Sequence, residues 1–381
     1  MKGLAVSLGV FTATGCAQRK GRAPRPGRGA VLLSAAVIAV LTSVAVAAGA
    51  SRAGTEKRAG TIAFIRLTPG PFGGRLFAIR ADGSGLRPLT SPSAKVTSYA
   101  WSRDGTRIAY IDQGGSLWLV RPDGGGRRLL LPRSRLQSVA LSWSPDGTRI
   151  AIASSGPAAR PWSWTNLRLY VVAIGGGAAV ALPAGKHVGY HLAWSPEGDL
   201  IYYDGSGGIW GIRLDGTGRR QLSPVGYVGS LSADGTQFAF NVVFPLRNGR
   251  NCCDRYRAFG VVNADGTGYH MVTSHSYNEY GEVWSPTGHR ILYGRADNQG
   301  IYVINPDSSD NHRVTRDSPP RAGWPALAWS PDGGAIVYDA GAVDGTGAGD
   351  TDLYVIGADG RGRVRLTNTP DIDLAPSWVA R

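Results

Sequence analysis

Short segments in which apolar and polar residues alternate recur along the chain, and the same turn interrupts each of them. LSWSPDGTRIAIAS at Leu141 is one copy, and WSRDGTRIAYI at Trp101 is another. Alternation with a period of two residues predicts β-strands. Ser-Pro-Asp-Gly predicts a tight turn, because Pro presets φ, Asp accepts a hydrogen bond from the backbone two residues on, and Gly tolerates positive φ. Each copy therefore predicts an antiparallel hairpin.

The copies align on a tryptophan, which a further copy, SLSADGTQFAF, replaces with Leu231. The tryptophans are Trp101, Trp143, Trp194, Trp284, Trp329 and Trp378. A second marker recurs once in each unit, such as RADGSG at Arg80 or RLDGTG at Arg213, with a predicted third strand before it and a fourth after it. The third strands begin near Leu117, Leu167, Gly208, Ile301 and Leu353.

A period of roughly forty to fifty residues with four short strands in each unit is typical of β-propeller blades. Seven corners and seven markers predict an all-β fold with seven blades of four strands. We expect the repeated turn to have a structural role, closing the inner hairpin of each blade, and each tryptophan to pack between neighbouring blades.

The two ends of the repeat region complement one another. Residues 61–90 lack a first strand with its tryptophan, and the chain stops just after APSWVAR at Ala375, which contains only that strand. We expect the C-terminal strand to complete the first blade, because closure removes the exposed sheet edges that otherwise promote aggregation.

The motif WSPDG-x-x-I-A-Y, followed by LYV and by D-G-x-x-x-x-L-T, resembles the TolB-like propellers with their WD-like repeats. The resemblance covers about residues 60–381 and implies the fold. It implies no single activity, since the family includes translocation partners, propellers attached to serine peptidases, sensor propellers and lyases. The name-giving protein has six blades, so the seven units here argue against transferring its partner to this chain.

The N-terminus predicts export. Residues 1–29 are basic without an acid, and residues 30–50 form an uncharged apolar run. As a helix this run would extend about 31 Å, close to the thickness of a bilayer. It also ends in an A-x-A-like signal-peptidase site before Ser51, so a cleaved signal peptide and a retained transmembrane anchor both fit. In either case the basic N-terminal side places the linker 51–60 and the propeller 61–381 outside the cytoplasm.

The net charge of +14 does not predict nucleic-acid binding, because the arginines of the repeat region are scattered rather than clustered. The chain contains no G-x-S-x-G, no P-loop, no dinucleotide fingerprint and no C-x-x-C. These motifs therefore give no support to a serine hydrolase, a nucleotide-binding enzyme or a thiol oxidoreductase.

Variation is concentrated in three insertions between predicted second and third strands: 154–166, 241–257 and 339–352. Such loops share one face of a propeller and are where binding residues are expected. Exposed aromatic and arginine side chains anchor partners. The candidate binding residues are Trp162, Trp164, Arg250, Arg255 and Tyr256.

A second candidate site uses residues of the connections between blades. His187, His191, His275 and Glu279 precede predicted first strands and so face one end of the central channel, where they form a candidate divalent-metal site. His187 and His191 share one side of a strand only if His187 is already extended. The aspartates of DGTGAGDTD at Asp344 miss the EF-hand spacing, so they do not predict a calcium loop.

Cys252 and Cys253 are adjacent in NGRNCCDRYR. Outside the cytoplasm paired thiols tend to oxidise. A vicinal disulfide, two free thiols and bridges to a partner remain three open interpretations.

Together these features predict a non-catalytic, extracytoplasmic and monomeric binding scaffold, secreted or membrane-anchored. Its expected partner is a protein or peptide of the cell envelope, without nucleic acid or cofactor. The alternative is a carbohydrate-active propeller, a lyase or lectin, with a metal at the channel mouth. A structural envelope protein without a dedicated ligand is a third interpretation.

Overall fold

The structure is a computed structural model. It describes residues 59–67, 74–132, 138–155, 167–185, 187–245, 255–274, 279–295, 300–317, 326–341 and 351–380. Of residues 138, 139, 244, 245, 255 and 256 it describes the backbone alone. The chain divides into two units, Met1–Ser34 and Ala35–Arg381, and all described residues belong to the second. The predicted signal or anchor segment and both cysteines of the vicinal pair lie outside the described residues.

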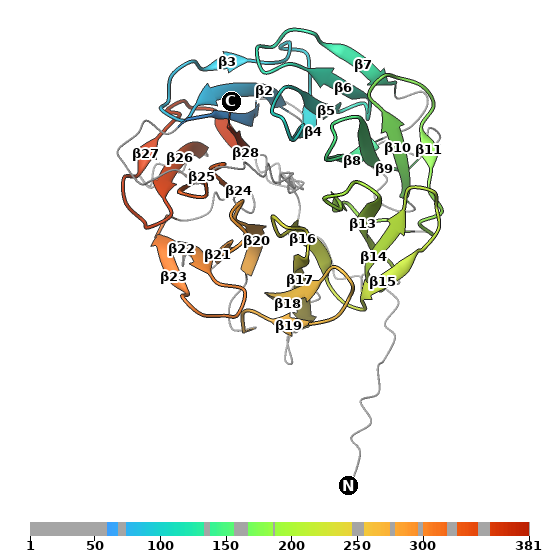
Figure 1. The fold of residues 1–381 in the computed structure, drawn as a ribbon. Helices are drawn as coiled ribbons and strands as arrows, with labels where there is room; N and C mark the ends of the chain where they lie inside the picture. Colours follow the sequence, from blue (N-terminus) through green and yellow to red (C-terminus); the bar gives the residue numbers. More distant parts are fainter. Residues whose placement is uncertain are drawn as a thin grey trace, which may run out of the picture. The chain divides into compact units, whose positions relative to one another are not determined.

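The described part of the chain is all-β and contains no helix (Figure 1). Its strands fall into antiparallel units of four, and the first strand of each unit ends at or just after the position of the repeated tryptophan. The first strands are β4 (Val96–Trp101), β8 (Ser138–Trp143), β12 (Leu192–Trp194), β16 (Tyr227–Leu231), β20 (Glu279–Trp284), β24 (Leu327–Trp329) and β28 (Ile372–Val379).

The second strand of each unit follows the tight turn. The second strands are β1 (Thr61–Leu67), β5 (Ile108–Asp112), β9 (Arg149–Ser154), β13 (Leu200–Gly205), β17 (Gln237–Pro245), β21 (Ile291–Arg295) and β25 (Ala335–Gly341). The third strands are β2 (Gly74–Arg80), β6 (Leu117–Val120), β10 (Arg168–Ala173), β14 (Gly208–Arg213), β18 (Arg255–Asn263), β22 (Gly300–Ile304) and β26 (Thr351–Gly357).

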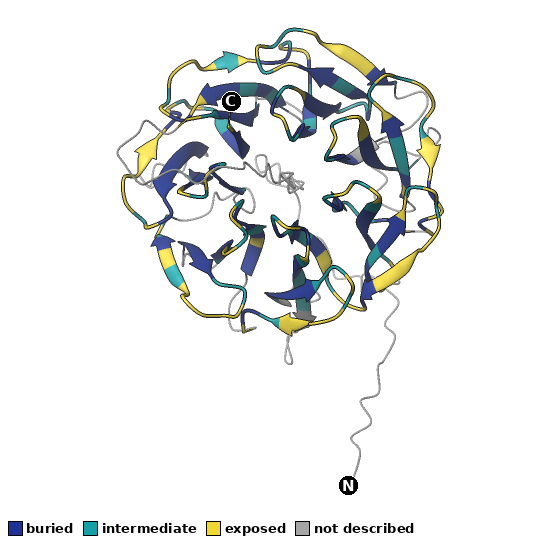
Figure 2. Ribbon diagram, viewed as in Figure 1, coloured by how far each residue is buried: buried dark blue, intermediate teal, exposed yellow. Residues whose placement is uncertain are grey.

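The fourth strands are short and exposed at the outer rim, where Figure 2 shows most of the exposed positions. They are β3 (Arg87–Pro88), β7 (Arg128–Leu131), β11 (Val180–Ala181), β15 (Arg220–Ser223), β19 (His270–Met271), β23 (His312–Thr315) and β27 (Val364–Arg365). Inner strands such as β1 and β5 are buried over almost their whole length. The core therefore lies between successive units rather than within one of them.

Four of these units are separate four-stranded sheets, and the remaining strands form one sheet of twelve. In the twelve-stranded sheet, one parallel pair, Thr351 with Ile372, joins β26 to β28. One antiparallel pair, Gly74 with Val96, joins β2 to β4. Contacts between first strands run from β4 through each following unit to β28, and β2, in the unit that β28 completes, contacts β4, so the order of neighbours is cyclic.

The repeated tryptophans link neighbouring units, as the sequence predicts. The indole N–H of Trp143 donates to the carbonyl oxygen of Ala100 at 3.0 Å, one residue before the tryptophan of the preceding unit. Trp194 donates in the same way to Ser142 at 3.0 Å, and Trp329 donates to Val283 at 2.9 Å. Each of these three indoles thus satisfies its buried polar atom while its rings fill the space between two sheets.

The repeated turn satisfies its own polar groups. Ser144 Oγ donates to Asp146 Oδ1 at 2.6 Å, which also accepts the backbone N–H of Thr148 at 3.0 Å. The hydrogen bond from Ser144 comes first among the effects that lower the pKa of Asp146. Gly147 has a φ of 66°, a conformation that glycine adopts at little cost. The prediction that this motif serves the scaffold is confirmed.

The C-terminal strand β28 pairs with β1, as predicted, from Thr61 with Val379 to Leu67 with Ile372. The ladder contains a bulge, and Ala375 there has a φ of 55°. Neighbouring units hold this bulge: the Tyr99 hydroxyl lies 2.6 Å from the Ala375 carbonyl oxygen, and the Ala375 N–H donates to Asp339 at 3.3 Å. β28 is therefore bound on both sides as well as to β1.

Candidate functional site

The two ends of the strands differ in chemistry. We call turn face the end that carries the first-to-second turns: residues 102–107, 144–148, 195–199, 232–236, 285–289 and 330–334. We call loop face the opposite end, which carries the second-to-third loops and the connections between units: residues 90–95, 112–116, 182–185, 187–190, 204–208 and 223–226.

Buried ionisable side chains gather at the loop-face ends of the strands. They are Arg66, Asp204, Glu279, Glu282, Asp339, Asp352 and Asp373. A buried charge is costly unless it is paired or hydrogen-bonded. The burial of each of these side chains therefore has to be explained by the groups that pair with it.

Asp204 and Asp339 occupy the same place in two units, three residues after the isoleucine that pairs with the tryptophan. Asp204 Oδ1 accepts a hydrogen bond from the N–H of Val228 at 2.5 Å, and Asp204 Oδ2 lies 2.5 Å from His191 Nδ1. Asp339 accepts the N–H of Ala326 at 2.7 Å as well as that of Ala375. Each carboxylate thus ties the residue that precedes the first strand of its own unit to the first strand of the next unit.

His191 is the described histidine most directly organised by a carboxylate. Its side chain is 26% exposed, and its ring lies edge-on to Tyr227, with centroids 6.3 Å apart. Desolvation lowers the pKa of His191, but the charge and hydrogen bond of Asp204 outweigh it and hold this pKa above the usual value. The imidazole is therefore fixed in orientation, and its protonated form is favoured.

Glu282 extends this group of side chains across the next unit boundary. It accepts a hydrogen bond from Asn241 Nδ2 at 2.8 Å, and burial raises its pKa. His191 and Glu282 favour each other's charged form. We call His191, Asp204, Tyr227, Asn241 and Glu282 the His191 cluster; it joins strands of three successive units at the loop face.

Asp339 makes stability depend on pH. Burial raises its pKa from 3.8 to about 7, against the opposing effect of the N–H donors of Ala375 and Ala326. The folded state then holds a proton that the unfolded chain has lost, so this residue's contribution to stability falls as pH rises from about 4 to 7. The full change is up to about 4 kcal/mol, at about 1.4 kcal/mol per pKa unit.

Asp339→Asn keeps the shape of this side chain without the charge. We expect the difference in unfolding free energy between wild type and Asp339→Asn to decrease steadily from pH 4 to pH 7 and to be level above that. Urea unfolding at four pH values measures it, because all other titrating groups cancel in the difference. A difference that is constant across this range would contradict the assignment.

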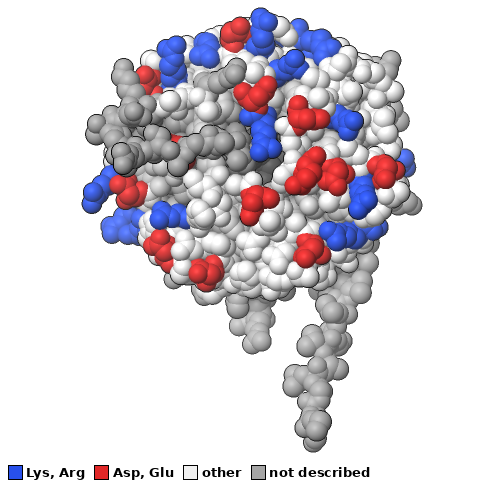
Figure 3. Space-filling model, viewed as in Figure 1, with Lys and Arg blue, Asp and Glu red and all other residues white. Residues whose placement is uncertain are grey.

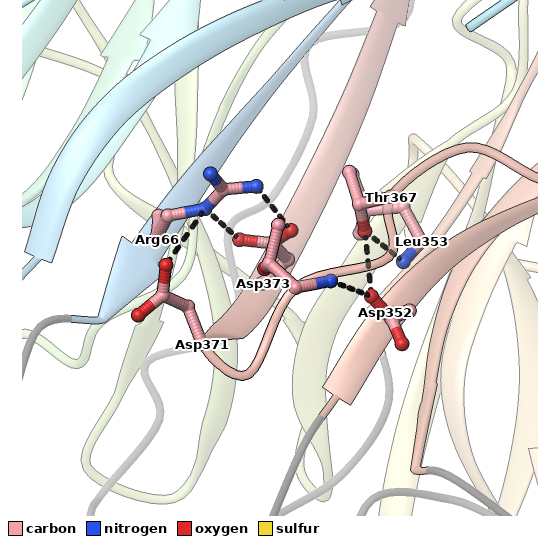
Figure 4. Close-up of polar contacts among 7 residues, drawn as sticks. Arg66, Asp352, Leu353, Thr367, Asp371 and Asp373 are labelled. Atoms are coloured by element: carbon pink, nitrogen blue, oxygen red, sulfur yellow. Dashed lines mark hydrogen bonds and ion pairs between the residues drawn. The ribbon is translucent and has the colours of Figure 1, made fainter.

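A second buried network lies where β1, β26 and β28 meet (Figure 4). Arg66 binds Asp373 through two hydrogen bonds, from Nε at 2.6 Å and from Nη2 at 2.8 Å. The pKa of the Arg66 guanidinium is raised, and its hydrogen bond to Asp373 is the largest cause. Asp352 accepts hydrogen bonds from Thr367 Oγ1 at 3.1 Å and from Arg365 Nη2 at 2.5 Å. These groups are paired with one another, so the network closes the sheet rather than offering a free site.

The residues of the predicted metal site do not converge among the described residues. His191 belongs to the His191 cluster, whereas His187 is exposed, has a φ of 66° and precedes the start of β12. Its backbone is therefore not extended, which was the condition for sharing a side with His191. Glu279 is buried, accepts a hydrogen bond from Thr273 Oγ1 and lies 3.6 Å from Arg295 Nε. His275 lies outside the described residues.

The described residues contain no group of three or more His, Cys, Asp or Glu side chains placed to hold a metal ion. His191 and Asp204 supply two donors, and the second oxygen of Asp204 is occupied by the Val228 N–H. This donor set does not fit a metal on its own.

The predicted binding residues fall in the insertions. Trp162, Trp164 and Arg250 lie outside the described residues. Arg255 and Tyr256 begin β18, where they pair with Pro245 and Phe244, and their side chains are not described. The described strands that flank the three insertions, β9 and β10, β17 and β18, and β25 and β26, have their facing ends at the loop face.

The surface charge and the lengths of the described elements are relevant to binding of charged partners and of membranes. Figure 3 shows Lys and Arg interspersed with Asp and Glu over the face in view, without a continuous patch of one sign. Across the described ranges, the structure has no helix with the length and apolar character needed to cross a bilayer.

No protein-family model matches the chain, and no curated protein matches it in sequence. Solved structures do match. TolB from Acinetobacter baumannii is 17% identical with a TM-score of 0.50, and the match covers 84% of this chain and 66% of that one. An oligogalacturonate lyase in complex with manganese is 15% identical with a TM-score of 0.59, covering 74% of this chain and 82% of the lyase.

An oligogalacturonate lyase from Vibrio parahaemolyticus gives the same TM-score of 0.59 at 13% identity, covering 74% of this chain and 83% of that one. The fold is that of a TolB-like β-propeller. The chain spans about two thirds of the length of the TolB structure. The four-stranded units are therefore propeller blades.

The sequence did not predict the roles of Asp204 and Asp339. The signal that identifies them is the Tyr-Asp pair close to the end of two second strands, Tyr203-Asp204 in β13 and Tyr338-Asp339 in β25. Both faces of an inner strand are buried in a propeller, so the alternation of apolar and polar residues does not show that these acids are enclosed.

Proposed function

We propose that this protein is a seven-bladed propeller that acts outside the cytoplasm as a non-catalytic scaffold for a protein or peptide of the cell envelope. The seven-blade count is supported by the weak joins in the twelve-stranded sheet, because a single residue pair at each join suits adjacent blades better than one continuous sheet. Export is supported by the basic segment 1–29 and the apolar run 30–50.

The observation that carries the binding role is the contrast between the two faces. On the turn face, serine, aspartate and backbone groups bond to one another in short, repeated turns, for example at Ser144 and Asp146. The loop face carries the ends of the strands that flank the three long insertions, and the His191 cluster, whose histidine and glutamate do not recur from blade to blade. Unrepeated loops on a repeated scaffold are the usual location of recognition.

The proposed contacts are Trp162, Trp164, Arg250, Arg255 and Tyr256. Replacing all five with alanine is expected to reduce affinity for the envelope partner at least 100-fold, since removing a single aromatic or arginine anchor commonly costs about 2 kcal/mol or more. Affinity capture from the envelope followed by quantitative mass spectrometry measures the loss, and an unchanged set of captured proteins would contradict the proposal.

A matched control removes polar side chains from the turn face. Thr148, Arg149, His289 and Arg290 are exposed there. Alanine at these four positions is expected to leave capture unchanged.

The His191–Asp204 pair favours a second function, a carbohydrate-active propeller. A histidine oriented by a carboxylate is suited to moving a proton during bond cleavage. In that case His191→Ala abolishes the release of new reducing ends from envelope or plant polysaccharides. Metal analysis separates the two functions, because one tightly bound divalent ion per chain supports the enzyme and disfavours the scaffold.

A further inference from the structure

Several blades of this propeller share a device built from a tyrosine, an aromatic ring and an arginine. In the blade β12–β15 the Arg219 guanidinium lies over the Trp210 ring at 3.8 Å, and Arg219 Nε lies 2.9 Å from the Tyr203 hydroxyl. The Tyr203 hydroxyl donates to the carbonyl oxygen of Ala184 at 2.8 Å. Ala184 belongs to the connection that enters this blade, so the chain itself supplies the acceptor.

The blade β24–β27 repeats the arrangement with a charged acceptor. Arg363 lies over the Tyr354 ring at 4.0 Å, and its Nε lies 3.0 Å from the Tyr338 hydroxyl. Asp317, in the connection that enters this blade, accepts from that hydroxyl and, at 2.8 Å, from Arg363. A carboxylate thus satisfies the tyrosine and the arginine together.

The blade β4–β7 has the same donors but lacks the acceptor. Arg127 lies over the Trp118 ring at 4.3 Å, and Trp118 stacks on Tyr110 with centroids 6.3 Å apart. Tyr110 is fully buried, and its hydroxyl has no acceptor for its proton among the described residues. A buried donor left in this way costs about 1–3 kcal/mol unless something binds it.

A cavity of about 270 Å³ lies at the loop face of this blade, beside the entering connection. Its lining includes Tyr110, Trp118, Arg127, Lys95 and Asp112. This volume is just below the range of about 300–1,000 Å³ that is usual for ligand pockets, so it suits a small molecule.

The charges of the cavity define the ligand class. Asp112 is already occupied, because its oxygens accept the Ser116 N–H at 3.0 Å and the Trp118 indole N–H at 2.8 Å. Arg127 and Lys95 are cationic, and together with Asp112 they leave the cavity one positive charge. A single carboxylate matches that charge and binds a guanidinium in bidentate fashion, whereas Asp112 would repel a doubly charged phosphate.

We propose that the cavity formed by Tyr110, Trp118, Arg127 and Lys95 binds a small molecule through its carboxylate group. The carboxylate takes the place that Asp317 fills in the blade β24–β27, accepting from the arginine and the tyrosine. This site is separate from the partner contacts of the insertions, so either assignment can stand without the other.

Ligand-observed NMR with the full-length protein tests the proposal. The probes are glucuronate, glutamate, benzoate and lactate, each compared with its neutral counterpart: glucose, glutamine, benzamide and propane-1,2-diol. At least one carboxylate is expected to bind while its neutral counterpart does not. Arg127→Gln and Tyr110→Phe are each expected to weaken that binding at least tenfold, with melting temperatures confirming that both variants fold.

Two matched variants serve as controls. Arg219→Gln alters the same device where Ala184 already supplies the acceptor, and it is expected to leave binding unchanged. Arg107→Gln alters a different arginine-lined cavity of about 430 Å³ and is also expected to leave it unchanged. Equal binding of carboxylates and neutral counterparts, binding by none of them, or loss with Arg107→Gln but not with Arg127→Gln would overturn the proposal.

Discussion

Deletion of residues 372–381 is expected to abolish the cooperative thermal unfolding of this protein. The deletion removes β28, which completes the blade of β1 and packs against blades on both sides. Trp378 belongs to a hydrophobic cluster with residues of β25 and β26, and Val379 belongs to another with residues of β4 and β5. Loss of a single buried tryptophan costs about 3–5 kcal/mol, and whole domains are stable by only about 5–15 kcal/mol.

Differential scanning calorimetry measures this effect. A shorter deletion of residues 380–381 is the matched control, because Ala380 is exposed and follows the end of β28. The control is expected to melt like the wild type. If the long deletion kept a sharp transition within a few degrees of the wild type, closure by β28 would not stabilise the ring.

Arg66→Met is expected to lower the free energy of unfolding by about 3–5 kcal/mol, because it leaves Asp373 buried without its cation. Asp373 is 0% exposed and Arg66 is 9% exposed, so water reaches this pair poorly. The double variant Arg66→Met with Asp373→Leu removes both charges, and it is expected to recover most of the lost stability. Urea unfolding of the two single variants and the double variant completes the cycle.

An exposed ion pair provides the comparison. Arg121 lies 3.4 Å from Asp123, with side chains 60% and 66% exposed. Arg121→Met is expected to cost less than about 1 kcal/mol. Equal losses for Arg66→Met and Arg121→Met would show that the buried pair does not hold β28 to β1.

Much of the fold follows from the sequence because each blade is specified locally. The tight turn and the alternating strands recur from unit to unit, in most units with the tryptophan, so the pattern of one unit predicts the strands of the next. The third strands predicted at Leu117, Gly208 and Ile301 are β6, β14 and β22. The closing strand was also predictable, because the first unit lacked a strand that the last residues supplied.

The candidate site was less predictable because it depends on pairings between units. His191 meets Asp204 inside its own blade, but Glu282 reaches this cluster from two blades further along. Sequence spacing carries no information on such neighbours. The hypothesis that His187 joins His191 depended on an extended backbone, which the φ of 66° at His187 does not provide.

The cavity beside Tyr110 can be recognised as a candidate site only when the blades are compared with one another. In sequence, Arg127, Arg219 and Arg363 occupy equivalent places after the second marker. The connections that enter the blades differ, and they supply an acceptor to Tyr203 and Tyr338 but not to Tyr110.

Site-specific photo-crosslinking in the intact cell envelope tests the central claim, that this propeller binds its partner through the loop face. The photoreactive residue p-benzoylphenylalanine is placed at Tyr227 or Gln113 on the loop face, and at Thr148 or His289 on the turn face. Tyr227 is 48% exposed, and both turn-face positions are exposed. The account predicts a discrete crosslinked partner from the loop-face positions alone. Crosslinks that arise only from Thr148 or His289 would contradict it.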